Sequence, residues 1–312
     1  MTIRDFRLFL LAALAVNLGG AAQRCVLAPA GPFTVAGSAY TVSAEHRGRT
    51  PDGNYGFQLT VSDNNREVTR LVDLTTRAAC LQGLRLARPD LLVVLGLLGG
   101  GGDILTLFDL SSSKVLDIMW GWDAEFSHRG NLIAYDYRYP PGGLPVYRTS
   151  ILLIYDLSRT PMDNSAHPEH LGDPETRGFI IHPARNRLRQ RYFIPAEDES
   201  EKFWFNSPFA WSGDDQKIAF LQHHQDRNSL VIVDISKGLK NPEIQELDMD
   251  RHMPTFYDEQ ERRSFKAPFL LPGKVRFGEG DSEVVVTPYR GGPSADKSVT
   301  IDLKTGERVD RP

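Results

Sequence analysis

A short pattern, in which an apolar segment ends in an aspartate and then resumes with another apolar residue, recurs along this chain of 312 residues. We call the aspartates of these copies the marker aspartates; they are Asp73, Asp109, Asp156, Asp234 and Asp302. Roughly 20 to 27 residues before each one, a polar turn opens a run rich in apolar and β-branched residues, which is typical of a strand. A period of this kind predicts one strand-rich unit repeated along the chain.

The polar turns show where each unit begins. They are Pro51-Asp52-Gly53, Pro89-Asp90, Ser127-His128-Arg129-Gly130, Ser212-Gly213-Asp214-Asp215 and Gly280-Asp281. Each unit then reads as turn, strand, hairpin, strand and a second turn that leads to a further strand. Successive marker aspartates are roughly 40 residues apart in the first half of the chain, about the length of a four-stranded propeller blade. The longer gaps after Asp156 and Asp234 hold either a degenerate blade or insertions.

These units predict an all-β fold, a β-propeller of five to seven four-stranded blades. One such sheet cannot bury both of its faces alone, whereas sheets stacked around a ring bury both and leave few edges. We expect a single domain over 23–312, with blades near 46–86, 87–123, 124–160, 161–207 (degenerate), 208–247 and 268–310. The isolated run 39–44 is expected to close the ring by adding a strand to the last blade.

Two segments carry a resemblance to a known repeat family. They are residues 127–135, Ser-His-Arg-Gly-Asn-Leu-Ile-Ala-Tyr, and residues 211–220, Trp-Ser-Gly-Asp-Asp-Gln-Lys-Ile-Ala-Phe. Both resemble the Ser-Pro-Asp-Gly-Lys-x-Ile-Ala-Phe core of the TolB-like, WD-repeat-like propeller family, although no copy keeps the whole core. The strands that follow, with Ile-Tyr-Asp-Leu and Val-Asp-Ile, are similar as well. Over residues 50–305 the resemblance implies the propeller fold and, as is frequent in that family, service as a periplasmic protein-binding scaffold.

Residues 1–22 have the order of a secretory signal peptide. Arg4 and Arg7 precede an apolar run over 8–18, and small residues follow up to Ala22, where we place the cleavage site. The run is too short to cross a hydrocarbon core, which needs about 20 residues in a helix. We therefore expect a periplasmic or secreted protein with no stable membrane insertion after cleavage. A membrane anchor or a buried first helix is the alternative.

Export would place the two cysteines, Cys25 and Cys80, in an oxidising compartment where they can pair. The bridge would tie the new N-terminus to the first repeat, and it would stabilise the fold by roughly 4 kcal/mol on the chain-entropy estimate. Two unpaired buried cysteines are the alternative.

The sequence offers little that resembles catalytic or cofactor chemistry. The formal net charge of −4 disfavours nucleic acid as a partner, because a phosphate backbone is bound by clustered positive charge. There is no Gly-x-Ser-x-Gly elbow of a serine hydrolase. The neighbours His223 and His224 would point to opposite faces of a strand and could not bind one metal ion. We predict no catalytic residue, metal or cofactor, and a structural role for the marker aspartates as acceptors for the turns that follow them.

The best candidate for a binding loop is the segment 135–148, which lengthens the third unit and concentrates Tyr, Arg and Pro. Aromatic and Arg side chains give large contact areas in protein interfaces, and long connections on a rigid scaffold tend to carry function. The residues expected to contact a partner are Tyr137, Arg138, Tyr139, Tyr147 and Arg148. The predicted function is a monomeric, non-enzymatic exported scaffold that binds a protein or peptide through loops at one mouth of the ring.

The alternative is a propeller enzyme of the lactonase, lyase or glycosidase type. Its acid and base would be carboxylates such as Asp123 or Asp136 in the central pocket. A deep pocket with convergent titratable groups would favour this enzyme, whereas a plugged channel with an exposed aromatic patch would favour the binding scaffold.

Overall fold

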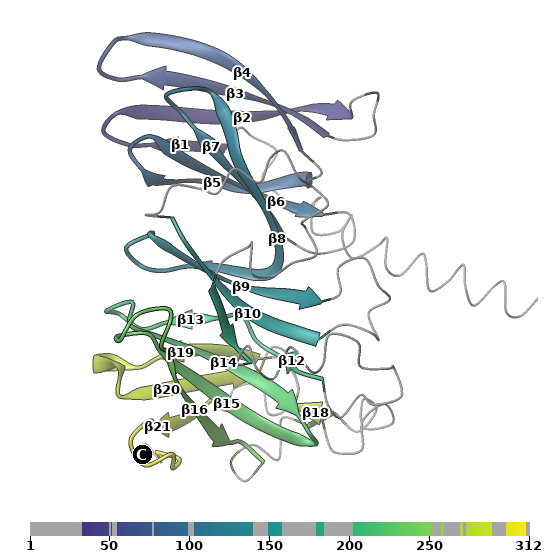
Figure 1. The fold of residues 1–312 in the computed structure, drawn as a ribbon, viewed down its shortest axis with the longest axis vertical. Helices are drawn as coiled ribbons and strands as arrows, with labels where there is room; N and C mark the ends of the chain where they lie inside the picture. Colours follow the sequence, from purple (N-terminus) through teal and green to yellow (C-terminus); the bar gives the residue numbers. More distant parts are fainter. Residues whose placement is uncertain are drawn as a thin grey trace, which may run out of the picture. The chain divides into compact units, whose positions relative to one another are not determined.

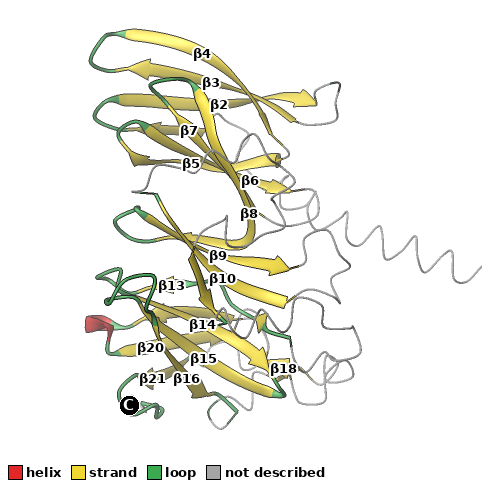
Figure 2. Cartoon of the chain, in the orientation of Figure 1, coloured by secondary structure: helices red, strands yellow, loops and turns green. Residues whose placement is uncertain are grey.

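The structure, a computed structural model, describes residues 33–49, 51, 55–76, 78–98, 103–139, 149–157, 179–183, 202–250, 252, 257–258, 269–270, 273–288 and 298–309 (Figure 1). Within these residues every regular element is a β-strand except one short 3₁₀ turn (Figure 2), so the chain is all-β as predicted. No helix in the described part is long and apolar enough to span a membrane. The predicted signal peptide, residues 1–22, lies outside the described residues.

The chain divides into two compact units, which are described separately. Among the described residues, unit 1 runs to Trp122 and unit 2 begins at Asp123. Unit 1 consists of two antiparallel meanders. Their strands are β1 (Phe33–Ala36), β2 (Tyr40–Arg49), β3 (Tyr55–Asp63) and β4 (Val68–Thr76), then β5 (Ala78–Arg88), β6 (Leu91–Leu98), β7 (Asp103–Asp109) and β8 (Lys114–Phe126), whose last residues enter unit 2.

Apolar side chains from one face of each meander form the core of unit 1. Phe57 and Leu59 of β3 pack in one cluster with Leu92 of β6 and Phe108 of β7, and all four are almost completely buried. Side chains alternate between the faces of a strand, so the same strand β3 turns Gln58 and Thr60 to the other side. The first meander therefore has one apolar face and one polar face.

The segment 39–44 does not have its expected role in closing the ring. Its residues 40–44 lie in β2, where Val42 is paired with Val35 of β1 on one side and with Val61 of β3 on the other. A strand has two hydrogen-bonding edges, and both edges of this segment are occupied within its own sheet. It has no free edge to offer to the last blade, so that prediction is wrong.

Unit 2 contains three further groups of strands. The first follows the end of β8 and contains β9 (Leu132–Tyr139), β10 (Thr149–Asp156) and β11 (Phe179–His182). The second contains β12 (Trp204–Phe205), β13 (Ala210–Trp211), β14 (Lys217–His224), β15 (Arg227–Asp234) and β16 (Glu243–Asp248). The third contains β19 (Gly273–Phe277), the 3₁₀ turn η7 (Glu279–Asp281), β20 (Glu283–Pro288) and β21 (Val299–Asp302), while β17 (Tyr257–Asp258) pairs with β18 (Phe269–Leu270).

The middle sheet of unit 2 is apolar on both faces. Alternate residues of β14 and β15, among them Phe220 and Val231, pack on one side with Ile154 of β10. The intervening residues, among them Leu221, pack on the other side with Val284 of β20. An antiparallel meander covered on both faces by its neighbours is the architecture of a propeller blade, which is the fold class that the sequence predicts.

The predicted degenerate blade at 161–207 is described only in part. Of its described pieces, β11 is hydrogen-bonded to β10 and β12 is hydrogen-bonded to β14, so each belongs to a neighbouring blade. The rest of this segment lies outside the described residues. The described part therefore contains no separate sheet there, and the number of blades stays a prediction.

Two aspartates join the turns of successive sheets in unit 2. The carboxylate of Asp215 accepts hydrogen bonds from the backbone amides of His128 (2.6 Å) and Arg129 (2.8 Å) in the preceding repeat. Asp281, in the next repeat, accepts from the amide of Gly213 at 3.1 and 2.9 Å. Both aspartates have the positive φ that Asp and Asn tolerate better than most residues. We call Asp215 and Asp281 the latch aspartates.

The Asp215→Asn variant should cost about 1 to 2 kcal/mol of unfolding free energy, because it weakens two hydrogen bonds to a charged acceptor that is 3% exposed. Asn retains the tolerance for positive φ. The Asp226→Asn variant is the matched control, since Asp226 has φ of 59° at a hairpin tip. Urea denaturation of both variants measures the difference. Equal midpoints would show that the latch does not stabilise the blades.

Candidate functional site

The marker aspartates of three repeats bind the turns that follow their strands. Asp109 accepts from the Ser111 amide at 2.8 Å and from the hydroxyls of Ser111 and Ser112 at 2.7 and 2.6 Å. Asp234 accepts from the Ser236 amide at 2.8 Å. Asp302 accepts from the amides of Lys304 (2.9 Å) and Thr305 (2.7 Å). Asp73 differs, because it accepts from Gln58 of the neighbouring strand at 3.4 Å. The structure places Asp156 at the end of β10.

These contacts lower the pKa of the carboxylates. Burial by itself would raise the pKa of Asp109, but the hydrogen bonds from Ser112 and Ser111 outweigh it and hold the pKa below its usual value. Burial would likewise raise the pKa of Asp234, but the hydrogen bonds from Ser236 outweigh it and lower the pKa. The backbone and hydroxyl of Thr305 lower the pKa of Asp302. These carboxylates are therefore held ionised by turn donors.

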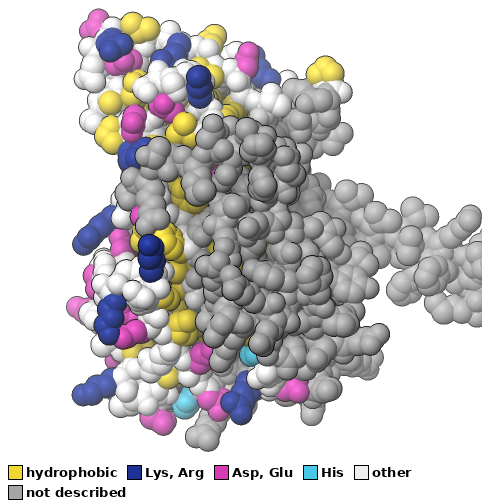
Figure 3. Space-filling view, viewed as in Figure 1, with side chains coloured by type: hydrophobic (Ala, Val, Ile, Leu, Met, Phe, Trp, Pro, Cys, Tyr) yellow, Lys and Arg dark blue, Asp and Glu magenta, His cyan; other side chains and the backbone are white. Residues whose placement is uncertain are grey.

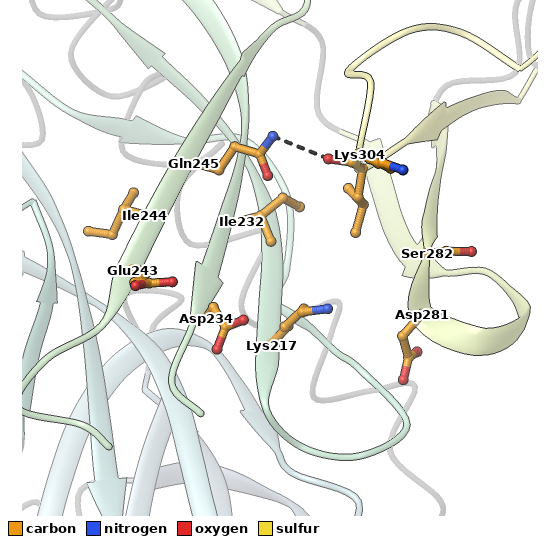
Figure 4. A pocket seen from close by; sticks show the side chains of 10 residues that line it. Lys217, Ile232, Asp234, Glu243, Ile244, Gln245, Asp281, Ser282 and Lys304 are labelled. Carbon is orange, nitrogen blue, oxygen red and sulfur yellow. Dashed lines mark hydrogen bonds between the residues drawn. The ribbon is translucent and has the colours of Figure 1, made fainter. Parts of the chain in front are cut away.

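A groove of about 500 Å³ runs along one face of β14, β15 and β16 in unit 2 (Figure 4). Lys217, Asp234 and Glu243 form one cross-strand row on its floor, at the ends of three neighbouring strands. Asp281 and Lys304, from the next repeat, line it as well. The groove thus presents both signs of charge, together with apolar lining residues such as Ile232, which is 4% exposed.

A second groove of about 490 Å³ lies at the equivalent place one repeat earlier. It contains the marker Asp156 where the first groove contains Asp234, and the latch Asp215 where the first contains Asp281. It also contains the basic turn residues Lys237 and Lys240. Because repeat positions recur in both, the grooves are a product of how one blade meets the turns of the next.

Strand β16 forms an exposed border of the first groove. It is paired with β15 and is the outermost strand of its sheet within the described residues. Glu243, Glu246 and Asp248 are exposed on it, and Glu243 makes an ion pair with Lys237. The side-chain amide of Gln245 donates to the Leu303 carbonyl at 3.2 Å and joins this strand to the next repeat. On the face shown in Figure 3, the described part of the surface carries interspersed Lys, Arg, Asp and Glu side chains.

The predicted binding residues of segment 135–148 fall only partly within the described residues. Tyr137 lies in β9 opposite Ile151 of β10, and its side chain is 5% exposed, so it packs in the interior of unit 2. The backbones of Arg138 and Tyr139 continue this pairing. The side chains of Arg138 and Tyr139, and all of Tyr147 and Arg148, lie outside the described residues. Their role in binding stays a prediction, whereas Tyr137 is part of the core.

The carboxylates considered for an enzyme lie in different environments. Asp136 is fully buried and accepts a hydrogen bond from the Ser150 hydroxyl at 3.1 Å. Asp123 is exposed in β8, with φ of 53°. A substrate in solution would reach Asp123 but not Asp136. Of the predicted disulfide, Cys80 lies in β5 and Cys25 lies outside the described residues, so the pairing stays a prediction.

The neighbouring histidines of β14 have separate partners. Nδ1 of His223 is 2.8 Å from Oδ1 of Asn228, whose Nδ2 donates to Asp250 at 2.8 Å, so the imidazole Nδ1–H is the donor in the first contact. The His224 ring stacks on Phe203 instead, with ring centres 3.7 Å apart. Within the described residues no group of three or more His, Cys, Asp or Glu is placed to hold a metal ion.

Sequence reasoning missed the latch aspartates and the two grooves. Asp215 and Asp281 stand in polar turns that the repeat pattern identifies, but the pattern alone does not say which backbone amides their carboxylates reach. Their recurrence at the same place in two turns is the signal that could have indicated a shared role. The grooves have no sequence signal, because each is formed by residues from two repeats.

Stability should fall with pH below neutrality through His223. Burial lowers its pKa by more than Asn228, Asp226 and Asp250 raise it. The unfolded chain therefore binds the proton at a higher pH than the folded protein does. The neutral imidazole leaves the free energy of unfolding undiminished above the ordinary pKa of 6.5, and the free energy of unfolding declines as pH falls from there towards the folded pKa. We expect His223→Asn to show a smaller loss of melting temperature than the wild type between pH 7.5 and 5.5.

The matched control for this measurement is His46→Asn, since His46 is exposed. This variant should follow the wild-type pH dependence. If His223→Asn and the wild type lose the same melting temperature, His223 does not couple protonation to stability.

Comparisons with known proteins were made for the whole chain. No protein-family model matches it, and no curated protein matches it. Solved structures that resemble it include Sqt1 of Saccharomyces cerevisiae, with 10% identity and a TM-score of 0.39 over 87% of this chain and 58% of that one. The β-propeller domain of the trilobed protease from Pyrococcus furiosus has 10% identity and a TM-score of 0.33 over 86% of this chain and 81% of that one.

TolB from Acinetobacter baumannii has 14% identity and a TM-score of 0.26 over 87% of this chain and 63% of that one. The chain thus spans less than two thirds of Sqt1 and of TolB. Likenesses at this level add no functional argument, and the fold rests on the sheets of the chain itself. Those sheets, antiparallel meanders that pack apolar side chains against neighbouring sheets, are β-propeller blades.

Proposed function

We propose that this chain is an exported, non-enzymatic β-propeller scaffold that binds a protein or peptide partner on the turn side of unit 2. The observation that carries the proposal is the pair of equivalent grooves, each bordered by a turn whose latch aspartate fixes it to the preceding repeat. Export is supported by the order of residues 1–22, which is typical of a signal peptide.

The turns that border the grooves lie at one end of their strands. In an antiparallel meander, the turn that precedes the second strand and the turn that follows the third strand lie at the same end of the sheet. In the middle sheet these turns are residues 212–216 and 235–241, and both contribute to the grooves. A partner that spans the two grooves would contact this end of unit 2.

The fixed turns favour tight binding because little has to be ordered when a partner arrives. Asp215 holds the backbone of residues 128–129, and Asp281 holds that of Gly213. Side chains and loops that are already ordered reduce the entropy lost on association. Such a surface suits a partner that already has a fixed shape or an extended peptide.

The chemistry of the grooves suits a polypeptide better than a small ion of one sign. Lys217 and Lys304 alternate with Asp234, Glu243 and Asp281 around the first groove. Complementary arrangements of both signs give specificity and orientation in protein complexes.

Strand β9 ends at Tyr139, at the opposite end of its sheet from turn 127–130. The prediction that Tyr and Arg residues of segment 135–148 contact the partner therefore concerns the chain that continues from that other end. The two surfaces can be tested against each other in one experiment.

We expect a photo-cross-linking residue at Lys240 or Lys304, on the groove side, to capture a discrete partner when the full-length protein is made in its own cell envelope. The same residue at Arg227, which follows the tip of the β14–β15 hairpin at the far end of the strands, is the matched control. The adducts are identified by mass spectrometry. We expect the adduct from the groove side to be at least about tenfold more abundant than the adduct from Arg227.

A variant in which residues 138–147 are replaced by a short Gly-Ser loop serves as the second arm. Adducts at Lys240 that persist in this variant support the groove side as the binding surface. Adducts found only at Arg227, or lost with residues 138–147, would move binding to the other end of the blades and contradict the proposal.

A further inference from the structure

Strand β4 is an edge strand that carries exposed apolar side chains. It pairs with β3 over its whole length, and among the described strands it ends the strand order of the first sheet of unit 1. Two of its residues, Val68 and Leu71, are 55% and 64% exposed, and they are two of the three large apolar side chains that are exposed in the described part of the chain. An edge strand has unpaired N–H and C=O groups that can accept a further strand.

Arg70, which lies between these two apolar residues, is half-buried and has two unsatisfied guanidinium nitrogens. Its Nε and Nη2 are buried, and within the described residues they have no hydrogen-bond partner. Its cross-strand neighbour is Val61, which is 1% exposed in the core of unit 1. Buried donors without an acceptor destabilise a fold, because they lose their bonds to water and gain none in return.

An inward-pointing charge on an edge strand can also be a protective feature that prevents strand addition. That role requires the charge to be hydrated, so that covering it is unfavourable. The buried Nε and Nη2 of Arg70 have already lost their water, so a carboxylate that arrived with a new strand would relieve a cost rather than create one. Another edge strand of the described part, β16, carries the exposed acids Glu243, Glu246 and Asp248, and such charges oppose the addition of a further strand.

We propose that β4 is the docking strand for an extended segment of a partner protein that adds to the sheet beside Val68–Thr76 and supplies a carboxylate to Arg70. Side chains of the added strand alternate between the two faces, as those of β4 do. The carboxylate would stand on the face of Arg70 and Val72, and an adjacent apolar residue would stand on the other face, beside Leu71.

The negative charge of Asp73 on β4 further restricts which residues the added strand can carry. Asp73 lies on the same face as Leu71 and is bound by Gln58 at 3.4 Å. A second acid on that face of the added strand would meet a like charge. The recognised segment therefore has an acidic residue on one face and apolar or hydroxyl residues on the other. This surface belongs to unit 1 and does not depend on the grooves of unit 2.

The test uses the full-length protein and a fluorescent nine-residue peptide of alternating Val and Thr with one central Glu, alongside a second peptide with Gln in place of Glu. We expect the Glu peptide to bind, and the Gln peptide to bind about tenfold more weakly, as the loss of a charged hydrogen-bonded pair requires. Arg70→Met should weaken binding of the Glu peptide to the level of the Gln peptide without changing binding of the latter.

The stability of the variants separates docking from a structural role. Arg70→Met removes the buried donors while keeping an apolar side chain of similar length, so its melting temperature should equal or exceed that of the wild type. Leu71→Thr should also keep its stability and weaken both peptides. The matched control is Ile244→Thr on β16, which removes the third exposed apolar side chain and should leave binding unchanged.

Three outcomes would overturn the inference. They are no binding of the Glu peptide to the wild type, equal binding to Arg70→Met, and a concentration-dependent dimer that Leu71→Thr abolishes. The last result would make a second copy of this chain the occupant. The groove proposal is judged separately by the cross-links at Lys240 and Lys304, which should be unaffected by Arg70→Met.

Discussion

Burial of both faces of the middle sheet of unit 2 is the constraint on which this structure depends. In the middle sheet of unit 2, alternate residues such as Phe220 and Leu221 enter two different cores, one on each face. A sheet of this kind would expose one apolar face to water if it stood alone, at roughly 25 cal/mol for each Å² exposed. The blades are therefore stable only in contact with one another, and the latch aspartates fix the turns at those contacts.

Much of the fold could be predicted from the sequence because its signals are local. The marker aspartates bind turns two or three residues away, so Asp109 and Asp302 carry the repeat in the sequence as well as in the structure. The role of segment 39–44 could not be predicted, because strand order depends on which hydrogen-bonding edge is already occupied. Val42 is paired on both sides, and a list of apolar residues does not show this.

The candidate sites were harder to predict because they arise between segments that are distant in the sequence. The groove of Figure 4 combines β14–β16 with Asp281 and Lys304 of the next repeat. Tyr137 was expected on a surface loop, but the β9 strand extends past it, and both faces of β9 are buried there, as the 0% exposure of the neighbouring Asp136 shows. Arg70 and Leu71 belong to an ordinary strand pattern, and only the position of β4 at the edge of its sheet makes them available to a partner.

Hydrogen exchange followed by mass spectrometry tests most directly whether the sheets depend on cover from both sides. If they do, the amides of β14 and β15, which lie between two cores, should exchange at the slowest rates in unit 2, and those of the exposed strand β16 should exchange much faster although it belongs to the same sheet. Protection that is equal across β14, β15 and β16 would contradict this account, because each sheet would then be stable through its own hydrogen bonds rather than through its neighbours.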